Sequence, residues 1–319
     1  MTDPNSKTVA VGIDLGGTQV RIGLLTPGGE LLAIQESLLE AERGPQTGMQ
    51  LITSMLEKLL QADDHPRVVG IGIGSTGPTD PIQGLIVNPG TLPGWVNVPI
   101  VSWLEQRFQV PACLENDADA AALGEYWQGA GRGARRLYAI TVGTGIGTAC
   151  IIDGKVYRGA GGFHPEGGHL IVDPGGPACY CGGCGCWESL ASGTAIAESM
   201  RRQLGKQPGA DLPNAKAIAE AARQGHPLAR RVIESAAESF ALGVFTVLMT
   251  FFPELIVLSG GVMRSYDLFQ PAIERALQDA SVYLPVERVQ IVQAQLGYYA
   301  GIYGAAYAIM KRNHDGLSA

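Results

Sequence analysis

The sequence is poor in positive charge and lacks the lysine motif by which many proteins bind nucleotides. Lys and Arg number 23 against 30 Asp and Glu, which gives a net charge of −7 and a pI near 5.3. This acidic balance argues against nucleic acid or an anionic membrane as the main partner. A Walker P-loop needs Gly-Lys followed by Ser or Thr, and the 319 residues contain no such tripeptide. Any phosphate must therefore be held by local features.

The sequence also lacks a long uninterrupted apolar run. Residues 1–8 are polar, so we expect no secretory signal there. The most apolar stretch, residues 240–258, contains Pro253 and Glu254, which favours a buried helix, a turn and a buried strand over a membrane span. With 46% hydrophobic and 17% charged residues, the chain is expected to be globular, long enough for two domains, and cytoplasmic.

Cysteine is concentrated in one short segment, which holds four of the six: Cys179, Cys181, Cys184 and Cys186. They lie too close together to form ordinary disulfides with one another. Clustered thiols with a nearby histidine, here His169, are typical of a structural zinc site and suit a reducing compartment. Since a tetrahedral site takes four ligands, one thiol should not bind if His169 does. A redox Cys-x-x-Cys pair or an iron–sulfur site are the alternatives, and the tight spacing disfavours both.

Two glycine-rich turns, each between β-rich runs, are candidates for binding phosphate. The first is Asp14-Leu15-Gly16-Gly17-Thr18, and the second lies within residues 141–148. Glycines let backbone N–H groups face a phosphate, although each turn also reads as a plain hairpin. We expect Asp14 to hold Mg²⁺ through water. The predicted ATP contacts are Gly16, Gly17, Thr18, Thr144, Gly145, Gly260 and Gly261.

Asn116 and Asp117 stand where a predicted strand ends and a helix begins. Ligands collect at such junctions in α/β folds, and the alternative role for Asp117 is an inert helix N-cap. By contrast, Gly72-x-Gly74-x-x-Gly77 only imitates a dinucleotide motif. Pro78 follows it in place of a helix, and residues 92–97 offer no acidic side chain for a ribose.

Two long motifs resemble the ROK family (repressors, open reading frames and kinases). They are Glu166-Gly167-Gly168-His169 and Cys179-x-Cys181-Gly182-x-x-Gly185-Cys186-x-Glu188. The resemblance implies an α/β, two-lobed actin-like or hexokinase-like ATPase fold with a structural zinc site. It implies a small lobe of residues 1–117 plus 300–319 and a large lobe of residues 118–299. It also implies that zinc is bound by His169, Cys179, Cys181 and Cys186, with Cys184 at a variable position.

The resemblance assigns further roles. It makes Asp117 the base that aligns the acceptor hydroxyl and takes its proton, and it places Trp95 at the sugar-facing rim. The expected partners are a small-molecule sugar and ATP, without nucleic acid or membrane, in a homodimer. The implied sugar contacts are Gly77, Asn116, Asp117, Glu166, His169 and Glu188.

The leading hypothesis is an ATP-dependent hexose kinase that phosphorylates the 6-hydroxyl of glucose. His164-Pro165-Glu166 is similar to ROK fructokinases, whereas the cysteine segment favours a glucokinase or an N-acetylglucosamine or N-acetylmannosamine kinase. A ROK repressor would need a helix-turn-helix domain before the first turn, and only about a dozen residues precede Asp14. A non-catalytic sugar-binding regulator is disfavoured by Asp117 and the two phosphate turns.

Overall fold

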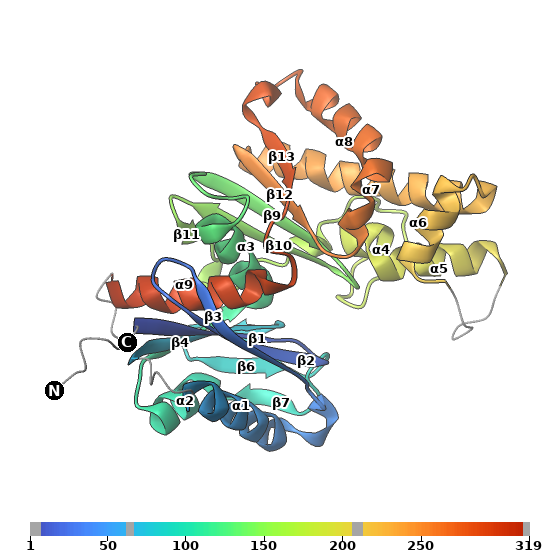
Figure 1. Cartoon of the computed structure of the whole chain (residues 1–319). Coiled ribbons are helices and arrows are strands. Elements are labelled where there is room, and N and C mark those ends of the chain that lie inside the picture. Colours follow the sequence, from blue (N-terminus) through green and yellow to red (C-terminus); the bar gives the residue numbers. More distant parts are fainter. Residues whose placement is uncertain (1–7, 62–66, 206–212, 315–319) are drawn as a thin grey trace. The chain divides into compact units, whose positions relative to one another are not determined.

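The computed structural model in Figure 1 describes residues 8–61, 67–205 and 213–314. The stretch in which we expect no secretory signal lies outside these ranges except for Thr8. The chain forms two compact units, each described here by itself. Unit 1 comprises Met1–Arg135, Ala149–Pro165 and Gln295–Ala319, and unit 2 comprises Arg136–Thr148 and Glu166–Ala294.

Unit 1 is built on a five-stranded sheet. Its strands are β1 (Thr8–Leu15), β2 (Gln19–Leu25), β3 (Leu31–Leu38), β4 (Arg67–Ser75) and β8 (Ala112–Asn116). Their order is β3-β2-β1-β4-β8, with the first three antiparallel and with β1, β4 and β8 parallel. A small sheet beside it consists of β5 (Thr79–Asp80), β6 (Leu85–Asn88) and β7 (Trp95–Val98).

The two faces of the five-stranded sheet meet different helices (Figure 1). Alternate side chains of β1, from Val9 to Leu15, join a large apolar core with α1 (Pro45–Leu60) and α2 (Ile100–Phe108). On the other face α9 (Ala300–His314) lies directly on the strand backbones. A Cβ atom at Gly12 would stand 2.0 Å from the Ile302 carbonyl oxygen, and one at Gly72 would stand 1.8 Å from that of Ala305. Only glycine fits there.

Helix α3 (Asp117–Gln128) joins unit 1 through the same kind of contact. A Cβ atom at Gly304 would lie 1.6 Å from the Ala120 carbonyl oxygen, so α3 and α9 touch backbone to backbone. This packing explains why the boundary of unit 1 differs from the predicted lobe of residues 1–117 plus 300–319. It also accounts for the glycines that imitate a dinucleotide motif, because Gly72 and Gly74 face α9 and α3.

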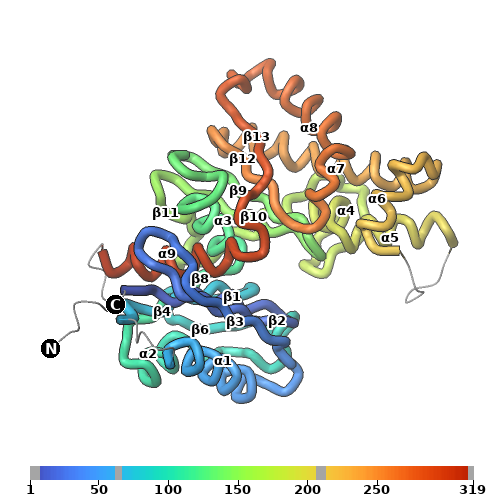
Figure 2. The backbone as a smooth tube through the Cα atoms, viewed as in Figure 1, coloured from blue at the N-terminus to red at the C-terminus, as the bar shows by residue number. Residues whose placement is uncertain are grey.

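A second five-stranded sheet has the order β11-β10-β9-β12-β13. Its strands are β9 (Arg136–Val142), β10 (Ile146–Ile152), β11 (Lys155–Val156), β12 (Leu255–Ser259) and β13 (Gln290–Gln293). In unit 2, β12 pairs in parallel with both β9 and β13, although β9 lies far away in the sequence (Figure 2).

Five helices complete unit 2: α4 (Trp187–Ala191), α5 (Gly193–Gln203), α6 (Ala215–Arg223), α7 (Pro227–Phe251) and α8 (Tyr266–Ala280). Helix α7 is long and apolar enough to span a membrane, but 56% of its most apolar stretch is buried inside the protein. Its end at Phe251 and the start of β12 at Leu255 confirm the predicted helix, turn and strand. Short 3₁₀ turns occupy Ala41–Arg43, Ala160–Gly162, Gly167–His169, Val262–Ser265, Val286–Arg288 and Gly297–Tyr299.

The close approach of α9 to the sheet predicts a strong sensitivity at Gly72. We expect Gly72→Ala to lower the free energy of unfolding by about 1–3 kcal/mol, because the added methyl group meets a backbone carbonyl that cannot move alone. Gly28→Ala is the matched control, since its Cβ atom would meet nothing closer than 3.8 Å. Urea unfolding of both variants measures the difference, and equal stability would argue against direct helix–sheet contact.

Candidate functional site

The predicted residues of unit 1 meet at one edge of its sheet. In the parallel register Leu15 pairs with Ser75, and Ser75 pairs with Asn116. The carboxyl ends of β1, β4 and β8 therefore lie in line, as at the ligand-binding edge of other α/β sheets. The first glycine turn, the loop with Gly77 and the start of α3 each follow directly from one of these strands.

Asn116, and not Asp117, caps helix α3. The Asn116 amide oxygen accepts the N–H groups of Ala118 at 2.8 Å and Asp119 at 3.4 Å. Asp117 is the first residue of the helix, and its carboxylate accepts the Ala118 N–H at 2.8 Å. Asn116 therefore provides the N-cap of α3, and the alternative role of Asp117 as that cap does not apply. A sugar contact by Asn116 would have to come from its amide nitrogen.

Asp14, the predicted magnesium residue, lies beside a cation. The Arg21 guanidinium donates to its carboxylate at 2.9 Å, because the two residues are register partners on adjacent strands. Burial raises the pKa of Asp14, and Arg21 acts in the opposite direction. The carboxylate also packs against α9, where a Cβ atom at Gly301 would lie 3.0 Å from it. An oxygen donor held this way, at the first phosphate turn, fits a hydrated Mg²⁺.

A partly buried ionic cluster adjoins the Asn116–Asp117 segment. Arg158 pairs with Glu115 and lies 3.7 Å from the Asp119 carboxylate, whose other oxygen meets the His164 ring at 3.0 Å. Burial raises the pKa of Glu115, and the nearby Arg158 opposes this shift. The cluster was difficult to predict from the sequence, because Arg158 and His164 lie far from the acidic residues along the chain.

Gly77 lies in a loop that is hydrogen-bonded to the start of the first phosphate turn, whereas Trp95 lies in the core. The neighbouring Thr76 donates its N–H to the Leu15 carbonyl at 3.1 Å. Trp95 is fully buried, and a Cβ atom at Gly48 of α1 would lie 2.4 Å from its ring. The prediction that Trp95 faces the sugar is therefore wrong, because the ring fills the core beneath α1.

In unit 2 the second glycine turn meets the Ser259-Gly260-Gly261 segment. Strand β12 pairs with β9 so that Ser259 opposes Thr141, and their hydroxyl oxygens are 2.7 Å apart. A Cβ atom at Gly260 would stand 2.3 Å from the Val142 carbonyl oxygen. The predicted ATP contacts Thr144, Gly145, Gly260 and Gly261 therefore gather at one edge of the sheet.

Glu188 reaches this same turn. Its carboxylate accepts the Ile146 N–H at 2.7 Å, and a Cβ atom at Gly145 would lie 2.2 Å from that carboxylate. Glu188 belongs to α4, whose first residue, Trp187, is fully buried against Gly243 of α7. The buried indole fixes the start of α4 and with it the place of the Glu188 backbone.

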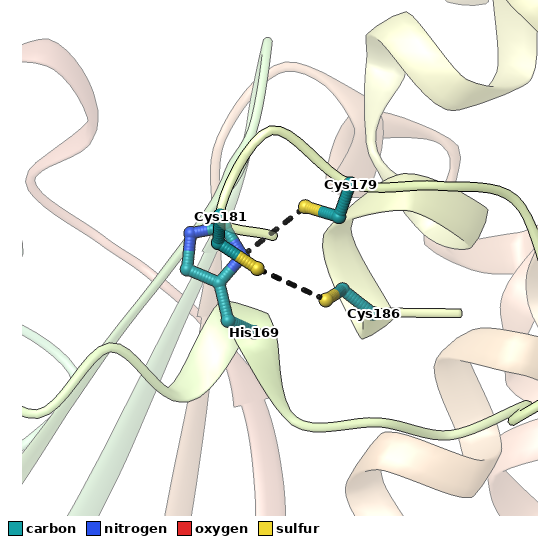
Figure 3. Close-up of side chains that lie close together, drawn as sticks. All are labelled: His169, Cys179, Cys181 and Cys186. Carbon is teal, nitrogen blue, oxygen red and sulfur yellow. Dashed lines mark hydrogen bonds between the residues drawn. The ribbon is translucent and has the colours of Figure 1, made fainter. Parts of the chain in front are cut away.

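The four side chains that the resemblance assigns to zinc lie together (Figure 3). The ligand atoms of His169, Cys179, Cys181 and Cys186 are all within 4.8 Å of one another. The Cys179 sulfur is 3.5 Å from Nδ1 of His169, and the sulfurs of Cys181 and Cys186 are 3.5 Å apart. Cys184 is exposed and does not belong to this group.

This donor set fits zinc. Three thiolates and one imidazole bound to one tetrahedral ion stand roughly 3.5–3.8 Å apart, close to the separations in the cluster. Burial raises the pKa of Cys186 to about 12, and a hydrogen bond from the Gly183 backbone lowers the pKa of Cys181. A bound metal would favour the thiolate form of both.

Glycines bring the histidine loop onto β10. A Cβ atom at Gly168 would stand 2.0 Å from the Ile146 carbonyl oxygen, and one at Gly167 would stand 2.3 Å from the Thr148 hydroxyl. The loop therefore lies against β10, next to the second phosphate turn. The exposed Glu166 precedes the two glycines in the chain and His169 follows them. The sugar contacts assigned by resemblance thus divide into Gly77, Asn116 and Asp117 of unit 1 and Glu166, His169 and Glu188 of unit 2.

Two neighbours of the predicted site residues were not anticipated in a functional role. Arg21 lies close to the first glycine turn in the sequence, and its pairing with Asp14 follows from strand register. Tyr180 stands between two of the cysteines, and its ring meets the His169 ring edge-on. In the sequence, only the position of Tyr180 within the cysteine motif indicated that it could lie near the site.

Comparisons with known proteins agree with this arrangement. The sequence profile of the ROK family matches residues 10–312. The chain is 33% identical to a glucokinase of Thermotoga maritima, covering 96% of this chain and 98% of that protein. Its fold is similar to that of a ROK hexokinase from Thermus thermophilus, with a TM-score of 0.85, 32% identity, and coverage of 97% and 100%. It is also similar to a ROK family glucokinase from Streptomyces griseus, solved with glucose and AMPPNP, with a TM-score of 0.78, 30% identity, and coverage of 95% and 99%.

The cysteine geometry predicts that the metal depends on three of the four clustered thiols. We expect Cys184→Ser to keep about one zinc per chain and Cys186→Ser to lose most of it, since a closed site needs all four of its ligands. Metal analysis of the two purified, soluble proteins makes the comparison. Loss of zinc from Cys184→Ser would contradict the ligand assignment.

Proposed function

We propose that this chain, which belongs to the ROK family and is an ATP-dependent sugar kinase, transfers the γ-phosphoryl group of ATP to the 6-hydroxyl of glucose. The observation that carries the proposal is the junction of β8 and α3, where Asn116 supplies the cap and Asp117 begins the helix. The similarity to glucokinases supports glucose as the acceptor.

Asp117 is assigned as the base. Phosphoryl transfer passes through a loose transition state, so positioning and charge neutralisation dominate. The acceptor hydroxyl must still lose its proton, and a carboxylate aligned with it can take that proton. The half-buried Asp117 is suited to this role because the cap does not depend on it.

The remaining sugar hydroxyls would be held by the other contacts assigned above. Such a site pairs donors with acceptors, because each buried polar group left unpaired costs about 1–3 kcal/mol. Glu188 suits an acceptor role, since a carboxylate that accepts one backbone N–H at Ile146 still has capacity for a hydroxyl. His169 directs Nδ1 toward Cys179, so Nε2 is its atom for a sugar hydroxyl.

ATP would be held without a lysine. Backbone N–H groups of Gly16, Gly17 and Gly145, the hydroxyls of Thr18 and Thr144, and the Gly260-Gly261 segment supply the contacts. Mg²⁺ bound near Asp14 would neutralise phosphate charge. Zinc would be structural, at His169 and three cysteines. A cytoplasmic location and a homodimer remain predictions.

The choice of sugar is tested directly by measuring ADP release with a panel of acceptors. We expect glucose to give the highest kcat/KM among glucose, fructose, mannose, N-acetylglucosamine and N-acetylmannosamine. Fructose is the second candidate, because of His164-Pro165-Glu166. A preference for any other member of the panel would overturn the glucose assignment while leaving a sugar kinase.

Replacing the proposed base tests the mechanism. Asp117→Asn keeps the size of the side chain and an oxygen that can accept the Ala118 N–H, so we expect sugar binding to persist. We expect kcat to fall by about 10²–10⁴-fold, the usual range for a lost base. The exposed Asp279→Asn of α8 is the control. A kcat above half of the wild-type value would exclude Asp117 as the base.

A further inference from the structure

The loop between Arg158 and His164 is closed on itself and fixed at both ends to one carboxylate. Inside the loop, the Gly159 N–H donates to the Phe163 carbonyl at 2.8 Å, so the two ends lie close together. The flanking residues, Arg158 and His164, both face Asp119 of α3. Nδ1 of His164 lies 3.0 Å from one Asp119 oxygen, and the Arg158 guanidinium lies 3.7 Å from the other. Asp119 therefore anchors both ends of the loop.

The contact between His164 and Asp119 is a buried hydrogen bond. The side chain of His164 is 7% exposed and that of Asp119 is 1% exposed. Because an ionised carboxylate has no proton to donate, Nδ1 of His164 is the donor. The backbone of Asp119 is fixed in turn, since its N–H donates to the Asn116 cap at 3.4 Å. The His164 ring is therefore held on the first turn of α3, the turn that begins with Asp117.

The loop has a composition that needs such an anchor. Three of its five inner residues are glycine, and Gly161 and Gly162 have φ values of 66° and 78°. Glycine loses more conformational freedom on ordering than any other residue. Apolar packing restrains the loop only weakly, because Phe163 is 47% exposed, and Ile82, which approaches Gly162, is 73% exposed. The buried hydrogen bond to Asp119 is therefore an important restraint on the end of the loop.

Pro165 connects the anchored ring to Glu166, which is assigned above as a sugar contact. The chain passes from unit 1 to unit 2 between Pro165 and Glu166. Proline fixes its own φ near −65° and confines the residue before it, here His164, to extended backbone. Few free torsions therefore separate the backbone of His164 from that of Glu166. The side chain of Glu166 is exposed, so its placement depends on this backbone more than on packing.

We propose that His164 is a positioning residue for the acceptor sugar, which acts by fixing, through Pro165, the backbone from which Glu166 reaches the sugar. The inference rests on the proposed function in taking Glu166 as a sugar contact. One hydrogen bond then joins the helix that carries the proposed base to the segment that carries Glu166. The competing explanation is that the bond between His164 and Asp119 only stabilises unit 1.

His164→Leu and His164→Asn test the role of the donor. The two new side chains have the same shape, but only Asn has an amide nitrogen in the place of Nδ1. We expect His164→Leu to raise the KM for the preferred sugar about 10-fold, as for the loss of a hydrogen bond to a charged group. His164→Asn should stay close to the wild-type value, and the KM for ATP should change in neither variant. His226→Asn is the control, because His226 caps α7 by accepting the Ala229 N–H at 3.3 Å, and Asn is also a good cap.

A double variant separates positioning from stability. His164→Leu alone leaves the Asp119 carboxylate buried without its histidine partner, which is destabilising. Combining it with Asp119→Leu removes both partners, and such a replacement by apolar groups of the same shape can be nearly neutral. We expect the double variant to recover stability in urea unfolding while its sugar KM stays raised. Recovery of the sugar KM together with stability would overturn the proposal, as would an equal rise of both KM values.

The test is independent of which hexose is preferred. All variants are assayed with the best acceptor from the panel, so a preference for fructose would end the glucose assignment and leave the His164 test intact. Calorimetric titration with the same sugar, without ATP, gives the Kd independently of turnover. An unchanged Kd in folded His164→Leu would refute the positioning role. Failure of every sugar to bind the wild-type protein would overturn the proposed function itself, and this inference with it.

Discussion

The structure depends on close contact between backbone segments at glycines, which have no side chain to hold the segments apart. Helix α9 lies on β1 and β4 at Gly12 and Gly72, where any Cβ atom would overlap a helix carbonyl. The same helix meets α3 at Gly304, so the start of α3 is fixed relative to the sheet. Asp117 is the first residue of α3, and its place follows from these glycine contacts as much as from β8. The proposed catalytic residue is thus positioned by the core of unit 1.

Unit 2 also depends on glycines for the close contacts around its candidate site residues. Gly167 and Gly168 let the histidine loop approach β10, and Gly145 leaves room for the Glu188 carboxylate at the second turn. These contacts bring the candidate metal cluster and the candidate sugar ligand Glu188, which share one motif, next to a candidate phosphate turn that lies elsewhere in the sequence. The fully buried Trp187 lies between Cys186 and Glu188 in the chain. The buried Trp187 therefore anchors both residues and connects the candidate metal ligand Cys186 to the candidate sugar contact Glu188.

The sequence was most informative where chemistry is local. The glycine turns, the strand before Asn116 and the helix, turn and strand around Pro253 follow from short patterns, and the structure has all of them. Features that depend on tertiary neighbours could not be read in this way. Trp95 in a polar loop sequence resembled a surface residue until α1 was seen to cover it. Unit 1 includes α3 because α3 packs on α9, and no local sequence pattern in α3 predicts this contact. Asn116 and Asp117 are both good caps, so only the actual geometry decides between them.

The acidic residues around this junction show why the distinction matters. Glu115, Asp117 and Asp119 alternate along the chain and have the same chemistry in isolation. The fold divides their roles, because Arg158 pairs with Glu115 and lies near Asp119, and His164 meets Asp119. Buried carboxylates need such partners, since an unpaired buried charge is strongly destabilising. The partners of Glu115 and Asp119 come from a distant segment of unit 1. Asp119 is fully buried, whereas Glu115 and Asp117 are both half-buried. The ion pairs of Glu115 and Asp119 give these two acids a structural role, while Asp117, at the first position of α3, is the residue proposed as the base.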